Sequence, residues 1–322
     1  MIKRRDILIS TGALASLAAA GTARAQIGGT PIRILVGAPA GGSTDTLARS
    51  LAASMGPVLG RTVVVENRPG AGGNIAAELV ARANPDGNTL LMSFTSHAIN
   101  ATLYPSLPFD PVKDFTALTC VATSPSILVA NPSVPAKDVR ELIALAKQKP
   151  GQLNFAIGAV GSSLHMAGEA FKLQSGVDIV NIPYKGTAPA VQDLLAGQVQ
   201  LMFAAVGNVQ AHIQAGKLKA LGVTTAKRLP AFPDVPAIAE MLPGYESSAW
   251  FGLFGPARMP ADTSRKISDA ARQALQQPDM RQRLQTEGAI PVGNSPEQFS
   301  AFVQGEIVRW AKVVKFSGAK PE

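Results

Sequence analysis

The chain has 322 residues, of which 5% are aromatic and 16% charged, and its formal net charge is +8. This length suits two domains, and the composition is that of a folded α/β protein rather than a disordered or membrane-embedded one. The charge is modest and no basic run alternates with aromatic residues, so the sequence gives no case for nucleic-acid binding.

The N-terminal segment 1–25 has the pattern of a secretory signal peptide. Basic residues at 3–5 precede an apolar run at 7–20, and the sequence A-R-A that ends at Ala25 suits cleavage there. The run is too short to span a bilayer. We therefore expect an exported protein that keeps 26 Lys and Arg against 21 Asp and Glu, a net charge of +5. Arg4 and Arg5 also fit the twin-arginine export route. Ordinary secretory signals are basic here too, so the route stays open.

The first predicted unit is a strand over 32–36, a turn over 37–42 and a helix that begins near 43–45. A strand that turns directly into a helix presents free backbone N–H groups at the positive end of the helix dipole, where an anion is stabilised. An ordinary tight turn without a ligand is the alternative. We expect an anion to bind at the loop formed by Ala40, Gly41, Gly42, Ser43 and Thr44.

Strand and helix patterns alternate along the rest of the chain. Strand patterns cover 62–65, 89–94, 127–130, 153–157, 177–182, 199–204, 220–224 and 250–254. The longer helical patterns cover 136–149, 262–276, 278–287 and 296–316. This alternation predicts an α/β fold in which each of two lobes is a mostly parallel sheet flanked by helices.

The proline-rich stretch 227–245 interrupts this alternation and is typical of a segment that crosses between lobes. We expect the ligand to sit between the lobes, at the carboxyl ends of the strands. The predicted first domain is discontinuous, over 26–124 and 229–322, and the second domain covers 125–228.

Several chemistries lack support in this sequence. The three histidines His97, His165 and His212 lie far apart and form no metal-ligand spacing. There is no G-x-S-x-G motif, and the glycines at 70–73 lack the G-K-[ST] of a phosphate loop. The single cysteine, Cys120, is expected to be a buried apolar residue. We therefore expect no catalytic residues, no metal and no cofactor.

A series of motifs resembles the substrate-binding proteins of tripartite tricarboxylate transporters, the Bug family. The series runs in the family's order over nearly the whole chain after the signal. It comprises P-A-G-G-S-T-D-T-L-A-R (39–49), E-N-R-P-G-A-G-G (66–73), N-P-D-G (84–87), S-F-T-S-H-A-I-N (93–100), A-I-G-A-V-G-S-S-L-H-M-A-G-E-A-F (156–171), I-P-Y-K-G (182–186), A-G-K-L-K-A-L-G-V-T (215–224), D-V-P (234–236), P-G-Y-E (243–246) and W-F-G-L-F-G-P (250–256).

The resemblance implies a two-lobed periplasmic binding protein of type II that closes around a small organic carboxylate, a di- or tricarboxylate or an aromatic acid. It implies membrane transporter subunits as partners, and we expect a monomer. Carried over motif by motif, the ligand shell comprises the first loop together with Thr95, Ser96, Gly158, Gly161, Ser162, Tyr184, Lys185, Gly186 and Ala204.

The sequence departs from the family pattern at Ala204, where many members carry an aspartate, and at Ala211, where a proline is usual. A buried ammonium group needs an acceptor or a negative partner. The apolar Ala204 therefore favours a carboxylate without an amine. Two other functions stay open at this stage, a ligand-binding sensor that signals through a membrane receptor and an exported hydrolase.

Overall fold

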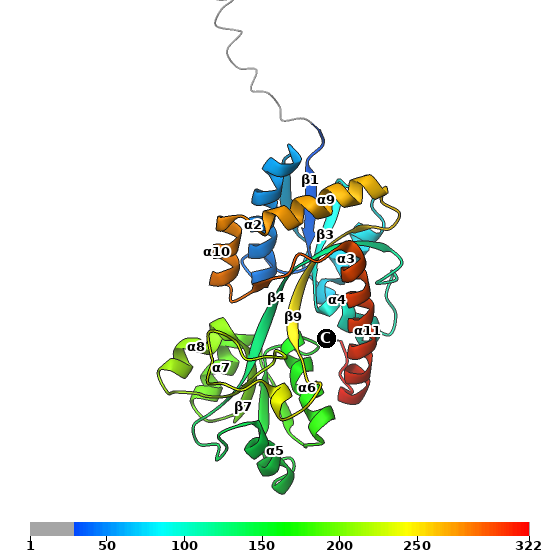
Figure 1. Cartoon of the computed structure of the whole chain (residues 1–322). Helices are drawn as coiled ribbons and strands as arrows, with labels where there is room; N and C mark the ends of the chain where they lie inside the picture. Colours follow the sequence, from blue (N-terminus) through cyan, green and yellow to red (C-terminus); the bar gives the residue numbers. More distant parts are fainter. Residues whose placement is uncertain (1–28, 322) are drawn as a thin grey trace, which may run out of the picture.

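The computed structural model describes residues 29–321, so the predicted signal peptide and its cleavage site lie outside the described residues. The chain forms two lobes connected by one continuous sheet of ten strands (Figure 1). The strand order is β2-β1-β3-β9-β4-β7-β5-β6, and β8 and β10 pair with β4 beside this path.

The first lobe holds the β2 end of the sheet, between two layers of helices. Its strands are β1 (Ile32–Val36), β2 (Val63–Asn67), β3 (Thr89–Phe94), β9 (Ser248–Pro256) and the short β10 (Ile290–Pro291). One face is covered by α2 (Ser43–Leu59), α9 (Ala261–Ala274) and α10 (Pro278–Thr286). The other face carries η1 (Ala71–Gly73), α3 (Asn74–Ala81), α4 (Ser96–Leu103) and α11 (Pro296–Ser317).

The second lobe repeats this layered arrangement. Its strands are β5 (Asn154–Ile157), β6 (Val180–Pro183), β7 (Leu201–Ala205) and β8 (Lys219–Val223). Helices α5 (Val139–Gln148) and α6 (Ser163–Ser175) cover one face, and α7 (Thr187–Leu195) and α8 (Val206–Gln214) cover the other. Buried apolar side chains on both faces supply most of the stabilising free energy.

A single long strand, β4 (Phe115–Ala130), belongs to both lobes. It pairs with β9 as far as Pro125 and with β7 from Ser126 onward. The strands at the outer ends, β1–β3 and β5–β7, are parallel as expected. In the first lobe β9 runs antiparallel to β3 and β4, and in the second lobe β4 runs antiparallel to β7 and β8, so each lobe has a mixed sheet.

The segment 229–246, which leads from the second lobe back to the first, was expected to belong to the first domain but packs on the second lobe. Leu229, Phe232 and Ala237 lie in the core of the second lobe, and the Tyr245 hydroxyl donates to the Ala167 carbonyl at 3.0 Å. By packing, the segment 229–246 therefore belongs with the second lobe rather than with the first. The limit at 124/125 stays a prediction.

Helix α11, assigned to the first domain from sequence, packs against α4 of the first lobe and α6 of the second (Figure 1). Among residues 29–321, no helix combines the length and the apolar character needed to cross a membrane.

The short helix α4 was not predicted, although it proves central to the site. Six of its eight residues are buried, including the polar Ser96, His97 and Asn100. A helix that is buried on most sides shows no amphipathic pattern, and amphipathic pattern is the main helical signal in a sequence.

Candidate functional site

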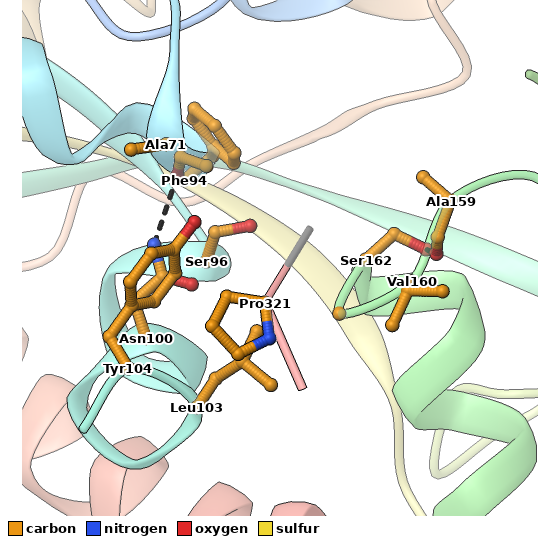
Figure 2. Close-up of a pocket in the computed structure, with 12 residues that line it drawn as sticks. Ala71, Phe94, Ser96, Asn100, Leu103, Tyr104, Ala159, Val160, Ser162 and Pro321 are labelled. Atoms are coloured by element: carbon orange, nitrogen blue, oxygen red, sulfur yellow. Dashed lines mark hydrogen bonds between the residues drawn. The ribbon is translucent and has the colours of Figure 1, made fainter. Parts of the chain in front are cut away.

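A cavity of about 400 Å³ opens between the lobes where the carboxyl ends of their strands face each other. Figure 2 shows the first-lobe residues on one side, the second-lobe residues on the other and Pro321 between them. The described lining residues are Ala71, Gly72, Phe94, Ser96, Asn100, Leu103 and Tyr104 from the first lobe, Ala159, Val160, Gly161 and Ser162 from the second, and Pro321.

Three helix starts converge on this cavity. Helix α4 begins at Ser96, α6 is capped by Ser162, and η1, which leads into α3, begins at Ala71. Each start follows the end of a parallel strand, so the fold itself brings the helices to one place. The first backbone N–H groups of a helix have no partner inside the helix and carry a partial positive charge. The arrangement favours an anion held from both lobes.

No Asp, Glu, Lys, Arg or His side chain occurs among the described residues that line the cavity. Across residues 29–321, moreover, no three His, Cys, Asp or Glu residues are grouped so that they could hold a metal ion. Any anion in this cavity would be stabilised by hydrogen bonds and helix dipoles rather than by a formal positive charge.

Two of the polar side chains in the wall already have partners. The Ser162 hydroxyl donates to the Ala159 carbonyl at 2.8 Å and accepts from the His165 N–H at 3.2 Å. The Asn100 amide donates to the Gly72 carbonyl at 3.1 Å. These bonds fix the loops on both sides of the cavity. Within the described chain the hydroxyls of Ser96 and Tyr104 have no hydrogen-bond partner, so they are the side-chain groups available to a ligand.

A buried polar cluster supports the second-lobe loop from behind. The Gly161 N–H donates to His165 Nδ1 at 3.0 Å, which places the proton of a neutral imidazole on Nε2. Glu169 accepts from Asn181 Nδ2 and from Lys172 Nζ, each at 2.6 Å. The bond to His165 holds Gly161 against helix α6. His165 and Glu169 are only 3% and 1% exposed, so water has little access to the cluster.

This cluster predicts a specific loss of stability in acid. Burial by itself would raise the pKa of Glu169, but hydrogen bonds from His165, Asn181 and Lys172 lower it from 4.5 to about 2. Because the folded pKa lies below the unfolded one, the carboxylate stabilises the fold above pH 4.5, and that contribution is lost as pH falls toward 2. The difference in pKa corresponds to about 3 kcal/mol.

We expect the wild-type free energy of unfolding, measured by urea denaturation, to fall by about 3 kcal/mol more than that of Glu169→Gln between pH 5 and pH 2. The difference between the two proteins isolates Glu169 from the other carboxylates. Parallel pH profiles for the two would contradict this assignment.

Comparison with known proteins bears directly on this geometry. The family described as the tripartite tricarboxylate transporter family receptor, TctC, matches residues 47–318. Protein BugT of Bordetella pertussis is 38% identical over 317 residues, which cover 98% of this chain and 96% of BugT. The chain belongs to this family. The resemblance to the Bug family is thereby confirmed.

Two solved structures of similar proteins contain carboxylates. Rpa4515 of R. palustris with adipate has 36% identity and a TM-score of 0.76, and covers 91% of this chain and 99% of its own. MatC from Rhodopseudomonas palustris with bound malate has 36% identity and a TM-score of 0.72, and covers 88% and 98%. This TctC protein is thus a periplasmic solute-binding protein with the two-lobed α/β fold predicted from its sequence.

Three residues of the ligand shell expected for a TctC protein line the cavity, namely Ser96, Gly161 and Ser162. Ala159 and Val160, which also line it, lie within the loop 158–162 that the family match assigns to the shell, and the sequence reasoning missed the other seven described lining residues. The glycine run at 70–73 was considered only as a phosphate loop, whose G-K-[ST] it lacks. Leu103 and Tyr104 belong to the unpredicted α4 or follow it directly, and Pro321 lies beyond the last helical pattern.

The first loop, from which we expected much of the anion affinity, lies outside the lining. Ala40, Gly41, Gly42 and Ser43 are exposed and Thr44 is buried. The Gly41 N–H donates to the Asp45 carboxylate at 2.9 Å, and the Gly42 N–H lies 3.5 Å from the Pro39 carbonyl oxygen. Two of the amides expected to bind an anion are therefore directed to groups inside the loop in this structure.

Asp45 organises that loop through further bonds. It is 3% exposed and accepts from Arg49 Nε at 3.0 Å and from Asn67 Nδ2 at 2.9 Å. Burial opposes ionisation, but the bonds from Arg49, Gly41 and Asn67 prevail and lower the pKa of Asp45. The Asp45 carboxylate therefore occupies the Gly41 N–H group that was expected to bind a ligand anion.

The remaining predicted residues are not among those that line the cavity. The Thr95 hydroxyl accepts from the Trp250 N–H at 2.9 Å, and the Gly186 N–H donates to the Gly158 carbonyl at 2.9 Å. Lys185, between Tyr184 and Gly186, is exposed.

Two of these residues have surroundings that differ from those expected of ligand contacts. The Tyr184 hydroxyl donates to Asp193 at 2.8 Å, and burial together with Asp193 raises its pKa to about 12. Ala204 is completely buried opposite Ile127 in β4.

Proposed function

We propose that this chain is an extracytoplasmic solute-binding protein that captures a small organic carboxylate between its lobes and delivers it to a tripartite tricarboxylate-type membrane transporter. The observation that carries the proposal is the convergence of three helix starts, from both lobes, on one cavity with no charged side chain in its described lining. Similar proteins that hold adipate and malate support the carboxylate class.

The remaining parts of the proposal follow from the sequence and the family. The chain is exported to the periplasm through its segment 1–25, by either the ordinary secretory or the twin-arginine route, and acts as a monomer without catalysis. The lobes close on the ligand by hinge motion at the two crossings, near 122–128 and 225–250. The first loop and the loop at Tyr184, Lys185 and Gly186 join the ligand shell on closure.

The ligand is a carboxylate without an amine. An ammonium group in the cavity would need a negative partner, but Ala204 is apolar and the described lining has no carboxylate. In a thermal-shift screen, we expect organic acids to raise the melting temperature, because a ligand that binds only the folded state stabilises it by mass action. At a ligand concentration 100 times Kd, the free energy of unfolding rises by about 2.7 kcal/mol.

The screen uses ligand pairs that differ by one ammonium group, succinate against aspartate and 3-phenylpropanoate against phenylalanine. We expect an acid to raise the melting temperature and its amino-acid counterpart to leave it unchanged. The largest shift from aspartate or glutamate would overturn the argument from Ala204. No shift from any carboxylate would overturn the carboxylate function itself.

Delivery to a transporter is tested in cells. Uptake of the labelled carboxylate should be lost in a strain that lacks the gene and restored by the full-length chain. Unchanged uptake, with loss of a transcriptional response to the ligand, would instead favour the sensor function.

A further inference from the structure

A second hollow lies on the first lobe, outside the ligand cavity. Its volume is about 450 Å³, and its described lining includes Arg33 and Leu35 of β1, Arg68 just after β2, and Ile75 and Leu79 of α3. None of the described residues that line it also lines the ligand cavity. The capture of a carboxylate between the lobes therefore leaves this hollow without a role.

The hollow lies where the helix layer ends beside the outermost strand. Strand β2 is the end strand of the sheet, and α2 packs against one of its faces. On the other face of the sheet α3 has only eight residues and packs against β1, β3 and β9. Val64 of β2 is paired with Arg33 of β1, so both side chains project on the face that the hollow occupies. This edge of the sheet thus has a helix on one side and a groove on the other.

Helix α3 is apolar on two of its faces. Ala76 and Val80 are completely buried in the apolar core. Ile75 and Leu79, one turn apart on another face, are 45% and 47% exposed, and Val64 on β2 is 41% exposed. Burial of the first pair stabilises the fold, whereas the exposed side chains contribute much less to it. An exposed apolar surface beside a hollow is typical of a site that binds another molecule.

Two arginines give the hollow a net positive charge. Arg33 donates to one Glu66 oxygen from Nε at 3.0 Å and from Nη2 at 2.8 Å, and Arg68 Nη2 donates to the other oxygen. The bonds from Arg33 and Arg68 lower the pKa of Glu66, so its single negative charge is present at neutral pH and balances one guanidinium. Both arginine side chains are about half exposed. Each guanidinium has five N–H donors, so donors and one positive charge remain for a second carboxylate.

We infer that this hollow is the surface on which the membrane transporter docks. The occupant is an extracytoplasmic transporter segment that lays apolar side chains on Ile75 and Leu79 and places a carboxylate between Arg33 and Arg68. The inference rests on the proposed function and names the surface of this chain that meets its partner. The charge decides between occupants, because a second copy of this chain docked face to face would bring the same two arginines against these.

The docking surface adjoins the ligand cavity through the start of α3. Ala71 and Gly72 line the cavity, and Ile75, three residues later, lines the hollow. Asn100 of the cavity wall donates to the Gly72 carbonyl at 3.1 Å and to the Asn74 side chain at 2.8 Å. A partner on α3 therefore lies within one helical turn of groups that surround the ligand, which suits a surface for delivery.

Charge reversal at Arg68 separates docking from ligand binding. In cells that depend on this chain for uptake, we expect Arg68→Glu to lower the uptake of radiolabelled adipate at least about tenfold, because the new carboxylate repels that of the partner. Malate replaces adipate throughout if it binds more tightly. Titration calorimetry of the purified variant should give the wild-type Kd, since Arg68 does not line the cavity. Arg265→Glu is the matched control, exposed on α9 at the opposite face of the sheet, and should change neither value.

Substitution at Leu79 tests the apolar part of the surface. Leu79→Asp should lower uptake at least about tenfold, whereas Leu79→Met, which keeps the apolar contact, should retain about half of it or more. Val308→Asp, at a valine 62% exposed on α11, is the control and should be neutral. Melting curves and the Kd for adipate establish that each variant is folded and binds before its uptake is compared.

Site-specific photo-crosslinking identifies the occupant directly. A photoreactive phenylalanine derivative at position 79 of the full-length chain should crosslink, in intact cells, to an integral membrane protein through a segment that contains Asp or Glu. The same derivative at position 308 should not. Exchange of that acidic residue for Arg in the partner should restore the uptake lost in Arg68→Glu.

The outcomes separate this inference from the function beneath it. Uptake that needs this chain but is normal in folded Arg68→Glu and Leu79→Asp variants would overturn the docking surface and leave the solute-binding function. So would a crosslink from position 79 to a second copy of this chain, no crosslink at all, or a second adipate bound by wild type and not by Arg68→Glu. Uptake that persists at the wild-type rate without this chain would overturn delivery to a transporter, and the docking surface with it.

Discussion

Replacement of Gly161 by valine is expected to weaken carboxylate binding about a hundredfold, or about 2.7 kcal/mol. Gly161 is buried in the cavity wall with φ +74°. A Cβ atom at this position would lie 2.5 Å from Leu103 Cδ2, across the gap between the lobes. Leu103 is itself packed in the core, so the valine would hold the lobes apart and fill space that the ligand needs.

The matched control for this variant is Gly176→Val, at the C-terminal end of the same helix α6. Gly176 has φ +67° and nothing within 4 Å of an added Cβ, so it shares the backbone strain without the contact between lobes. Titration calorimetry should show normal affinity for Gly176→Val and similar losses of melting temperature for the two variants. Normal affinity in Gly161→Val would show that closure does not bring this loop to the ligand.

Removal of the Glu306 side chain is expected to lower the free energy of unfolding by about 3–5 kcal/mol. Its Oε2 accepts from both tryptophan indoles of the chain, Trp250 at 3.1 Å and Trp310 at 2.9 Å, and its other oxygen lies 3.2 Å from Arg309 Nε. Glu306 is 6% exposed. Glu306→Ala would therefore leave two buried N–H donors without an acceptor and a void between α11 and β9.

Glu306→Gln is the informative companion, because its amide oxygen can still accept from both indoles and only the ion pair with the partly exposed Arg309 is lost. It should cost about 1 kcal/mol or less. Denaturation should be followed by far-UV circular dichroism, since the indole environment changes in these variants. Glu297→Ala, at the exposed start of α11, should be nearly neutral. Equal losses in the alanine and glutamine variants would show that charge, rather than the indole bonds, stabilises this contact.

The contact between Glu306 and Trp250 is connected to the ligand cavity through Thr95. The Trp250 backbone N–H donates to the Thr95 hydroxyl, and Thr95 directly precedes Ser96 at the start of α4. Glu306 thus connects α11, strand β9 and the first-lobe wall of the cavity. For that reason Glu306→Ala should also weaken the binding of any ligand held by Ser96.

The sequence by itself determined the local elements and the family. The apolar run at 32–36 followed by glycines and hydroxyl residues gave the first strand and helix, and the regular pattern at 296–316 gave α11 to within one residue. The motif series identified the family because it depends on residue order alone. Ser96, Gly161 and Ser162 were placed at the site by their match to the family's motifs, and their positions just after strands agree with a site at the carboxyl edge of the sheet.

The tertiary structure decided which strand-end groups face the cavity. The Gly41 amide looked free in the sequence but donates to Asp45, four residues later. Gly161 meets Leu103 from the other lobe, and Thr95 is bonded to Trp250, 155 residues away. Helix α4, buried on most sides, has no periodic signal although it forms one wall. The cause is the same in each case, since partners and burial depend on residues that only folding brings together.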